Sequence, residues 1–328
     1  MKDIGIVGLP YTGKSTIFTA LTRSGSQGGR SNQAVVDVPD ERLQVLTDIE
    51  SSKKTVHAKV RFVDVPGGFT AQGIAEFRTM DALCIVLNAF GPDNDPVKEL
   101  GSVEAELVIN DLTSIESGLE KARKRAKSQK EAVAEVAVLE RASALLEQER
   151  PLREGDFSDP EDRKILRGYG PLTLKPWVIV ANVEEGGDVP GGLPDGSIAI
   201  SAALEAEVAG VEDPAEAREL LAGFGVEEPG LDKVIDACYR ALDLITFLTT
   251  GADETRAWEV RKGAKAPEAA GAIHSDLERG FIRAEVIHYD TLVEAGSWDA
   301  AKAKGALRVE GKDYTVVEGD ILNIRFAV

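Results

Sequence analysis

The sequence predicts an α/β protein with a doubly wound sheet, an inserted helical hairpin and a smaller α+β module at its C-terminal end. Over the first two-thirds of the chain, short apolar runs alternate with helical stretches, as in sheets whose parallel strands are buried on both faces. Residues 102–148 contain one glycine and no proline. From residue 245 the pattern changes to short strands with small helices.

The first apolar run, residues 4–9, ends at a proline that follows a glycine and a leucine, which favours a buried parallel strand. A helix is expected directly after it, over residues 14–23. Residues 24–32 are rich in glycine and serine and predict a loop. The other strands expected in this sheet cover residues 34–38, 56–65, 83–90, 177–182 and 197–201.

The stretch between two of these strands is rich in Ala, Glu, Lys, Leu and Arg. Apolar residues recur at helical spacing before and after Ser128. They are Ile115, Leu119 and Ala122, and then Val133, Val136 and Leu139. This pattern predicts an antiparallel helical hairpin with its bend near Ser128, inserted into the first domain at about residues 102–150.

Helices are expected over residues 214–223 and 231–244, where the first domain, residues 1–244, is expected to end. The second domain is expected to span residues 245–328. Its expected strands cover residues 257–261, 283–289, 306–310 and 322–328.

The composition excludes several function classes. The net charge is −18, which argues against wrapping or specific binding of DNA. No run of about 18 apolar residues is present, so no membrane span is expected. The two cysteines lie in separate apolar stretches and the three histidines show no zinc-ligand spacing. These features favour a reducing, cytoplasmic location.

Residues 8–16 read Gly-Leu-Pro-Tyr-Thr-Gly-Lys-Ser-Thr and fit G-x-x-x-x-G-K-[ST] between a strand and a helix. In such a phosphate-binding loop, the P-loop, backbone N–H groups and a helix N-terminus surround a polyphosphate. A lysine adds charge at the β- and γ-oxygens, and the serine hydroxyl can bind Mg²⁺. The expected nucleotide-binding residues here are Leu9, Pro10, Tyr11, Thr12, Gly13, Lys14, Ser15 and Thr16.

A second phosphate-side motif is Asp64-Val-Pro-Gly67, at the end of an apolar strand, which fits D-x-x-G. Its carboxylate can hold Mg²⁺ and its glycine N–H can reach a γ-phosphate. We therefore expect Ser15 and Asp64 as metal ligands. Lys14, Asp64 and Gly67 are the candidate catalytic residues.

The base of the nucleotide is expected at the end of the strand over residues 177–182. GTPases carry N-K-x-D there, whereas this chain has Asn182, Val183 and then Glu185 at the Asp position. Glutamate is one methylene longer, which disturbs the guanine contacts and leaves both ATP and GTP open. Ser201 and Ala202 fit the last base-loop element.

These motifs together resemble the YchF family, the Obg-like ATPases of the P-loop GTPase class. The resemblance also rests on ISAALEAEV at residues 200–208, VEEPGLDKVI at 226–235 and a long block at 244–287. It implies a P-loop NTPase sheet with a helical hairpin and a C-terminal TGS-like β-grasp domain. It further implies Mg²⁺-dependent hydrolysis, often with ATP preferred over GTP, and association with ribosomes or translation factors.

The chain departs from that family pattern at several points. Tyr11 and Thr12 replace Asn and Val in the P-loop, and Gly68 replaces a leucine. A threonine that would complete the Mg²⁺ shell is missing before Asp64; Ser26 and Ser31 are candidate substitutes. The family pattern already lacks the water-positioning glutamine of Ras-like enzymes, and Gly68 does not replace it. No histidine or glutamate near the second motif is an obvious base. We therefore expect slow intrinsic hydrolysis.

Two functions remain open from the sequence. The first is a slow ATPase or GTPase that acts as a ribosome-associated regulatory switch. The alternative is a non-catalytic, nucleotide-sensing binding module. A small-molecule kinase is disfavoured because the base-loop elements are present. A basic cluster near the hairpin bend and the C-terminal domain are candidate contacts to the ribosome or RNA: Lys121, Arg123, Lys124, Arg125, Lys127 and Lys130.

Overall fold

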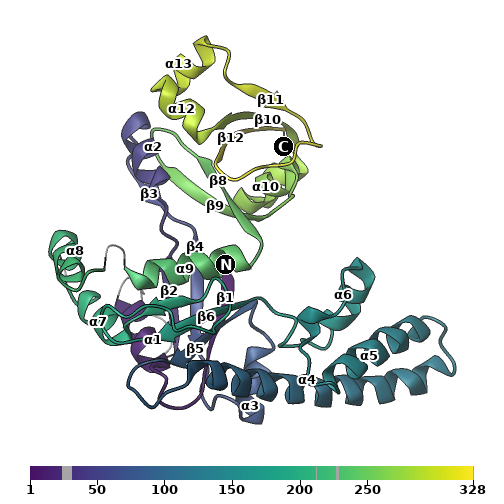
Figure 1. Ribbon diagram of the computed structural model, residues 1–328. Helices are drawn as coiled ribbons and strands as arrows, with labels where there is room; N and C mark the ends of the chain where they lie inside the picture. The colour runs from purple at the N-terminus through teal and green to yellow at the C-terminus, as the bar shows by residue number, and fades with distance from the viewer. Residues whose placement is uncertain (24–31, 212, 227–228, 328) are drawn as a thin grey trace. The chain divides into compact units, whose positions relative to one another are not determined.

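The computed structural model describes residues 1–23, 32–211, 213–226 and 229–327 (Figure 1). Its contacts divide the chain into two compact units. The first contains residues Met1–Val36 and Arg61–Val234, and the second contains Asp37–Val60 and Ile235–Val328. Residues 37–60 were expected in the first domain, whereas in the structure they pack with the C-terminal part of the chain.

The first unit is built on a six-stranded sheet in the order β2-β4-β1-β5-β6-β7. The pairs β1–β5, β5–β6 and β6–β7 are parallel. Six of the seven residues of β5 are buried, as expected of a strand covered on both faces. The expected doubly wound sheet is confirmed. The strands are β1 (Lys2–Val7), β2 (Gln33–Asp37), β4 (Lys59–Asp64), β5 (Ala82–Asn88), β6 (Trp177–Asn182) and β7 (Ile198–Ile200).

Helices connect these strands, and polar side chains cap several of them. Thr70 caps α3 by accepting from the Gly73 N–H, and Ser201 caps α7 by accepting from the Leu204 N–H. The helices are α1 (Lys14–Arg23), α3 (Ala71–Phe77), α6 (Pro160–Arg167), α7 (Ala202–Val208) and α8 (Pro214–Gly223), with a 3-10 turn at Leu152–Glu154. Helix α9 (Gly230–Ala241) contains the boundary between the two units, after Val234.

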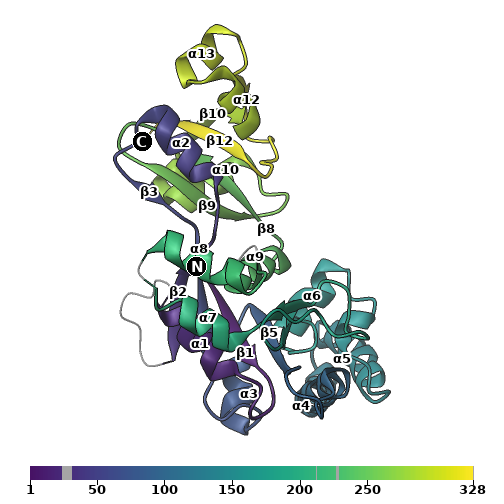
Figure 2. The ribbon, with the colours of Figure 1, turned by 60° about the vertical axis from the view of Figure 1, so that its left-hand side comes forward.

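The hairpin consists of α4 (Pro96–Ala126) and α5 (Ala132–Leu146), which lie side by side in Figures 1 and 2. Ser128 lies in the connection between them, where the bend was expected. Helix α4 begins six residues earlier than residue 102, because Asp95 caps it and Pro96 is tolerated in the first turn. The hairpin has its own apolar core, which includes Ile115, Leu119, Ala122, Val138, Leu139 and Ala142.

The second unit contains a mixed sheet in the order β11-β10-β12-β8-β9-β3. Strand β12 pairs with β10 in the antiparallel and with β8 in the parallel sense. The strands are β3 (Thr55–Val56), β8 (Leu244–Thr249), β9 (Thr255–Arg261), β10 (Phe281–His288), β11 (Arg308–Glu310) and β12 (Asp320–Phe326). The helices are α2 (Arg42–Glu50), α10 (Ala266–Ile273), α11 (Ser275–Arg279), α12 (Tyr289–Ala295) and α13 (Trp298–Ala303).

Two expected elements differ in the structure. The single strand expected over residues 56–65 is divided into β3 and β4, which belong to different sheets. The break falls at His57 and Ala58, which bond instead to the backbone of Val38. The helix expected to run to Leu244 ends at Ala241. Leu244 instead starts the largely buried strand β8, which pairs with β9.

We predict that Leu139→Ala destabilises the protein by about 2–5 kcal/mol, because it opens a cavity in the hairpin core, where Leu139 is fully buried. Val133→Ala on the same helix is the control. Val133 is 56% exposed, so its loss should cost under about 0.5 kcal/mol. Urea denaturation followed by circular dichroism measures both, and equal effects would contradict the packing of the hairpin described above.

Candidate nucleotide-binding site

The P-loop connects β1 to α1 in the conformation that the motif requires. Tyr11 and Gly13 both have positive φ, at 69° and 92°. A side chain at Gly13 is sterically excluded, because its Cβ would lie 2.2 Å from the Asn182 amide nitrogen. Tyr11 is 92% exposed although its backbone is strained. Strain that packing does not explain is typical of a functional loop.

The Lys14 side chain bonds back to the backbone of its own loop. Its ammonium group donates to the Leu9 carbonyl and lies 3.5 Å from the Thr12 hydroxyl. Burial lowers the pKa of Lys14, and the carboxylates of Asp64 and Glu99 act in the opposite direction. Burial likewise raises the pKa of Asp64, against the effect of Lys14. The site therefore holds one cation close to carboxylates from two other elements.

Asn182 ties the P-loop to the loops that follow β6 and β7. Its amide nitrogen donates to the Thr12 carbonyl at 3.0 Å, and its amide oxygen accepts from the Ala202 N–H at 2.9 Å. The side chain is buried, so both bonds are shielded from water. Asn182 thus fixes the geometry of the site, and its amide is already committed within the protein.

The first cavity at the P-loop has a volume of about 930 Å³. It brings together most of the expected nucleotide-binding residues from three separate loops. These are Tyr11, Thr12, Gly13, Lys14, Ser15, Thr16, Asn182, Val183, Glu185, Ser201 and Ala202. A concave site of this size, with backbone amides at one end, can hold a nucleotide.

A second cavity, of about 590 Å³, shares Lys14 and Ser15 with the first. It also contains Pro10, Asp64 and Gly67. Leu9 lines neither cavity, and its part in the site is the carbonyl that accepts from Lys14. The two motifs on which the sequence analysis depended thus meet at Lys14 and Ser15.

The donor set suits Mg²⁺. The Ser15 hydroxyl and the Asp64 carboxylate line the same cavity, and both are hard oxygen ligands. Among the described residues, no group of three or more His, Cys, Asp or Glu side chains could hold a metal alone. A magnesium ion here would take its remaining ligands from phosphate and water, as it commonly does.

Sequence reasoning missed several residues of the site. Phe90, Glu184 and Ala203 line the first cavity, and Glu184 accepts from the Gly91 N–H at 3.3 Å. Glu99, in the first turn of α4, accepts from the Asn88 N–H at 2.9 Å. Its other carboxylate oxygen is buried and makes no hydrogen bond to any described residue. Glu184 is the unspecified residue of the motif expected at 182–185, Ala203 follows the Ser201-Ala202 element, and Phe90 lies just after β5. These positions could have pointed to the three residues, whereas no motif marks Glu99.

One remaining expectation concerns residues outside the described ranges, and another concerns membrane-spanning helices. Ser26 and Ser31, the candidate substitutes for the missing threonine, lie outside the described residues. No helix within the described ranges has the length and apolar character needed to cross a membrane.

Two family models match this chain. One, described as a 50S ribosome-binding GTPase, matches residues 3–146. The other, named YchF-GTPase_C and described as a protein of unknown function (DUF933), matches residues 244–327. The first match covers the P-loop and the hairpin, and the second covers the C-terminal sheet.

Curated relatives match over nearly the whole chain. The Ribosome-binding ATPase YchF of Bacillus subtilis (strain 168) is 38% identical over 99% of both chains. Obg-like ATPase 1 of Oryza sativa subsp. japonica is 34% identical over 99% of this chain and 92% of its own. The solved structure of the Schizosaccharomyces pombe YchF GTPase superposes with a TM-score of 0.88 at 31% identity. It covers 99% of this chain and 97% of its own. Together with the P-loop geometry, these matches show that the chain is a P-loop NTPase and belongs to the YchF family.

Proposed function

We propose that this protein hydrolyses ATP, and GTP less efficiently, in a slow Mg²⁺-dependent reaction, and that it acts as a ribosome-associated regulatory switch. The observation that carries the proposal is the position of Lys14 and Ser15, which line both cavities. A nucleotide whose base lies near Val183 and Glu185 would extend its phosphates past Lys14 toward Asp64 and Gly67. One ligand would then occupy both motifs.

The base is read by the loop after β6. Because both polar atoms of the Asn182 amide are engaged by Thr12 and Ala202, Asn182 has little capacity left for the base. Recognition therefore falls to Val183 and to the carboxylate of Glu185. A carboxylate can accept from the adenine amine, whereas the paired guanine donors need the shorter reach of an aspartate. This argument favours ATP.

Catalysis in this site relies on charge and position. Lys14 would neutralise the β- and γ-phosphate oxygens, and the Gly67 N–H would lie at the γ-phosphate. Ser15 and Asp64 would hold Mg²⁺, which supplies further positive charge to the phosphates. Among the described residues that line the second cavity, none is Gln, Glu or His. With no such group to orient the attacking water, slow intrinsic turnover is expected.

We predict that Lys14→Ala weakens ATP binding by about 10- to 100-fold, because a charge-assisted hydrogen bond contributes about 1.5–3 kcal/mol. Calorimetric titration with Mg-ATP measures this, with phosphate release followed in the same samples. Lys124→Ala, an exposed lysine on α4, is the control. EDTA should abolish release in the wild type. Tight binding without any release would instead support the non-catalytic sensor.

We predict that Glu185→Asp shifts the preference from ATP toward GTP by at least about tenfold, which corresponds to about 1.4 kcal/mol. The shorter carboxylate restores the aspartate found in GTPases. Competition between the two nucleotides, measured by displacement of a fluorescent analogue, gives the ratio. The same change at Glu207, an exposed residue of α7, should leave the ratio unchanged. An unaltered ratio in Glu185→Asp would remove Glu185 from the base site.

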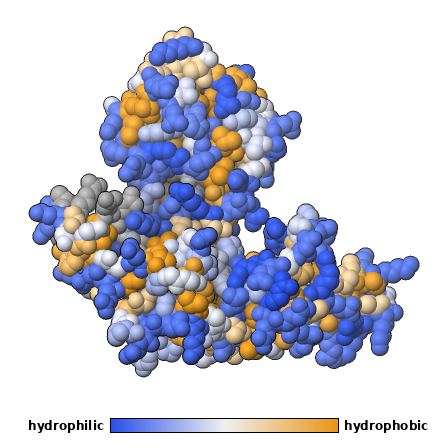
Figure 3. Space-filling model, viewed as in Figure 1, coloured by the Kyte–Doolittle hydropathy of each residue, from blue (hydrophilic) through white to orange (hydrophobic). Residues whose placement is uncertain are grey.

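Ribosome association is proposed from the names of the relatives and from the hairpin. Three members of its basic cluster, Arg123, Lys124 and Arg125, are paired with glutamates. The others, Lys121, Lys127 and Lys130, form no ion pair with any described residue. Figure 3 shows a largely hydrophilic surface over the hairpin. A cavity of about 520 Å³ beside Lys121, Lys124 and Arg125 is wide enough for a phosphate group. The cluster thus offers RNA a local cationic site on an acidic protein.

We predict that reversing the charges of Lys121, Lys127 and Lys130 to Glu weakens binding to purified ribosomes by at least tenfold at 100 mM salt. The salt dependence of log K should become shallower by about 2, at roughly 0.7 per phosphate contact. The control reverses three surface cations away from the cluster, Arg150, Lys164 and Arg240. Equal loss in both variants would assign the effect to net charge.

A further inference from the structure

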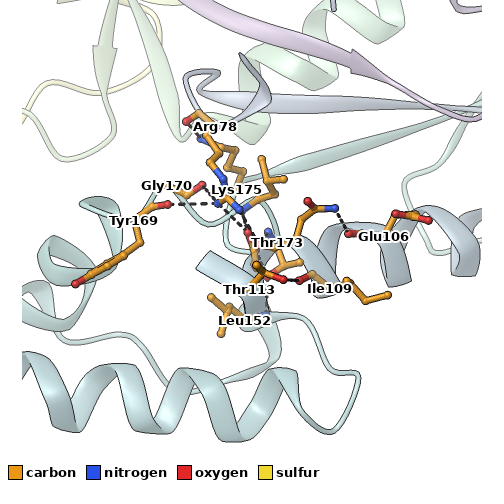
Figure 4. Close-up of polar contacts among 12 residues, drawn as sticks. Arg78, Glu106, Ile109, Thr113, Leu152, Tyr169, Gly170, Thr173 and Lys175 are labelled. Carbon is orange, nitrogen blue, oxygen red and sulfur yellow. Dashed lines mark hydrogen bonds and ion pairs between the residues drawn. The ribbon is translucent and has the colours of Figure 1, made fainter. Parts of the chain in front are cut away.

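The residue after α3, Arg78, joins this helix to the hairpin (Figure 4). It meets α4 at Asn110 and Asp111, which we call the base of the hairpin. One guanidinium nitrogen donates to the Asp111 carboxylate at 3.1 Å and to the carbonyls of Gly170 and Tyr169 at 3.0 and 3.3 Å. Another donates to the Asn110 carbonyl at 2.8 Å. A single side chain thus bonds to helix α4 and to the segment that leads into β6.

Asp111 completes this junction from the side of α4. It is fully buried, and it accepts from the N–H groups of Leu172 and Thr173 at 2.9 and 2.8 Å. The Thr173 hydroxyl donates to it as well, at 2.8 Å. On the same segment, the Lys175 ammonium group donates to the Arg78 carbonyl at 3.0 Å. So many bonds in a buried place make the junction a rigid attachment.

The other end of α3 begins at the D-x-x-G loop. Thr70, its cap, lies three residues after Gly67. Gly67 and Gly68 have positive φ, and a side chain at Gly68 would meet no atom within 4 Å. The backbone of Gly68 lies directly against α3, because a Cβ at Gly73 would come 2.0 Å from the Gly68 carbonyl oxygen. The helix has seven residues and is about 10 Å long. A shift of this short helix would therefore move the loop at Gly67 and Gly68 with it.

We propose that Arg78 is a positioning residue that sets the place of Gly67 at the γ-phosphate and the arrangement of the hairpin base together. The proposal rests on the nucleotide function above and extends it to communication within the first unit. By reciprocity, a nucleotide that alters α3 alters the hairpin base, and a partner on the hairpin alters α3 to the same extent in free energy. Arg78 contacts neither the cavity at Asp64 nor the one at Asn182.

The test uses Arg78→Lys, because removing the charge altogether would leave Asp111 buried and unpaired. Lysine keeps the charge but loses the fork that reaches several acceptors at once. Hydrogen exchange at the Leu172 and Thr173 amides reports on the junction directly, since both donate to Asp111. The matched control is Arg153→Lys. Arg153 lies over the Trp177 ring and pairs with Glu104 of α4. Among the described residues, its side chain makes no hydrogen bond or ion pair to α3.

We expect a non-hydrolysable ATP analogue with Mg²⁺ to change exchange at Leu172 and Thr173 by at least threefold in the wild type and in Arg153→Lys. In Arg78→Lys this response should disappear, while nucleotide protection of the P-loop amides persists. The kcat should fall about tenfold with KM within twofold, since Gly67 acts on the transition state. Asp111→Asn should give the same pattern, and the double variant should lose no more than either single one.

Three results would overturn the inference. The first is a wild type in which the two amides do not respond to nucleotide. The second is an Arg78→Lys protein, folded by circular dichroism, that retains both the response and the wild-type kcat. The third is a wild type whose P-loop amides gain no protection, which would remove the proposed nucleotide function and this inference with it. Protected P-loop amides with silent junction amides would refute the inference alone.

Discussion

The buried amide of Asn182 is the interaction on which the site depends. Its two hydrogen bonds join the P-loop to the segment after β7, across a sheet in which β1, β5 and β6 are neighbours. The carboxyl ends of parallel strands meet at one edge, where α/β proteins bind their ligands. Because that amide lies against Gly13, Asn182 excludes a larger residue at this position, in addition to any requirement that a bound phosphate would impose. The motif at residues 8–16 is thus only one part of a structure that extends to residue 202.

The electrostatics of the site are local. The protein carries a net charge of −18, which by itself would repel a nucleotide. Lys14 lies close to the carboxylates of Asp64 and Glu99 and bonds to a carbonyl of its own loop. In the function proposed above, a polyphosphate would compete for that ammonium group, helped by backbone N–H groups and a divalent cation. The affinity for a nucleotide would then come from the groups around Lys14 and not from the overall charge of the protein.

The sequence could predict what depends on neighbours along the chain. The P-loop, the D-x-x-G motif and the hairpin each follow from residue type and short-range spacing, and strand β6 has the expected bounds. What it could not predict depends on contacts between distant segments. The division of residues 56–65 is decided by pairing with β9, and Glu99 enters the site through the turn that starts α4. Arg78 looks like an ordinary surface cation until Asp111 and residues 169–173 are brought beside it.

The described residues that line the second cavity include no glutamine, glutamate or histidine that could position a water molecule, which gives the junction at Arg78 its importance. In the function proposed above, the groups that would meet the γ-phosphate are the backbone N–H of Gly67 and the Lys14 ammonium group, and both residues line the second cavity. A backbone N–H can be aligned only by moving the backbone, and the backbone after Gly67 continues directly into α3. In the proposed function, control of hydrolysis would act through the position of α3. The last residue of this helix, Phe77, packs into the sheet core, and the next residue, Arg78, attaches it to the hairpin.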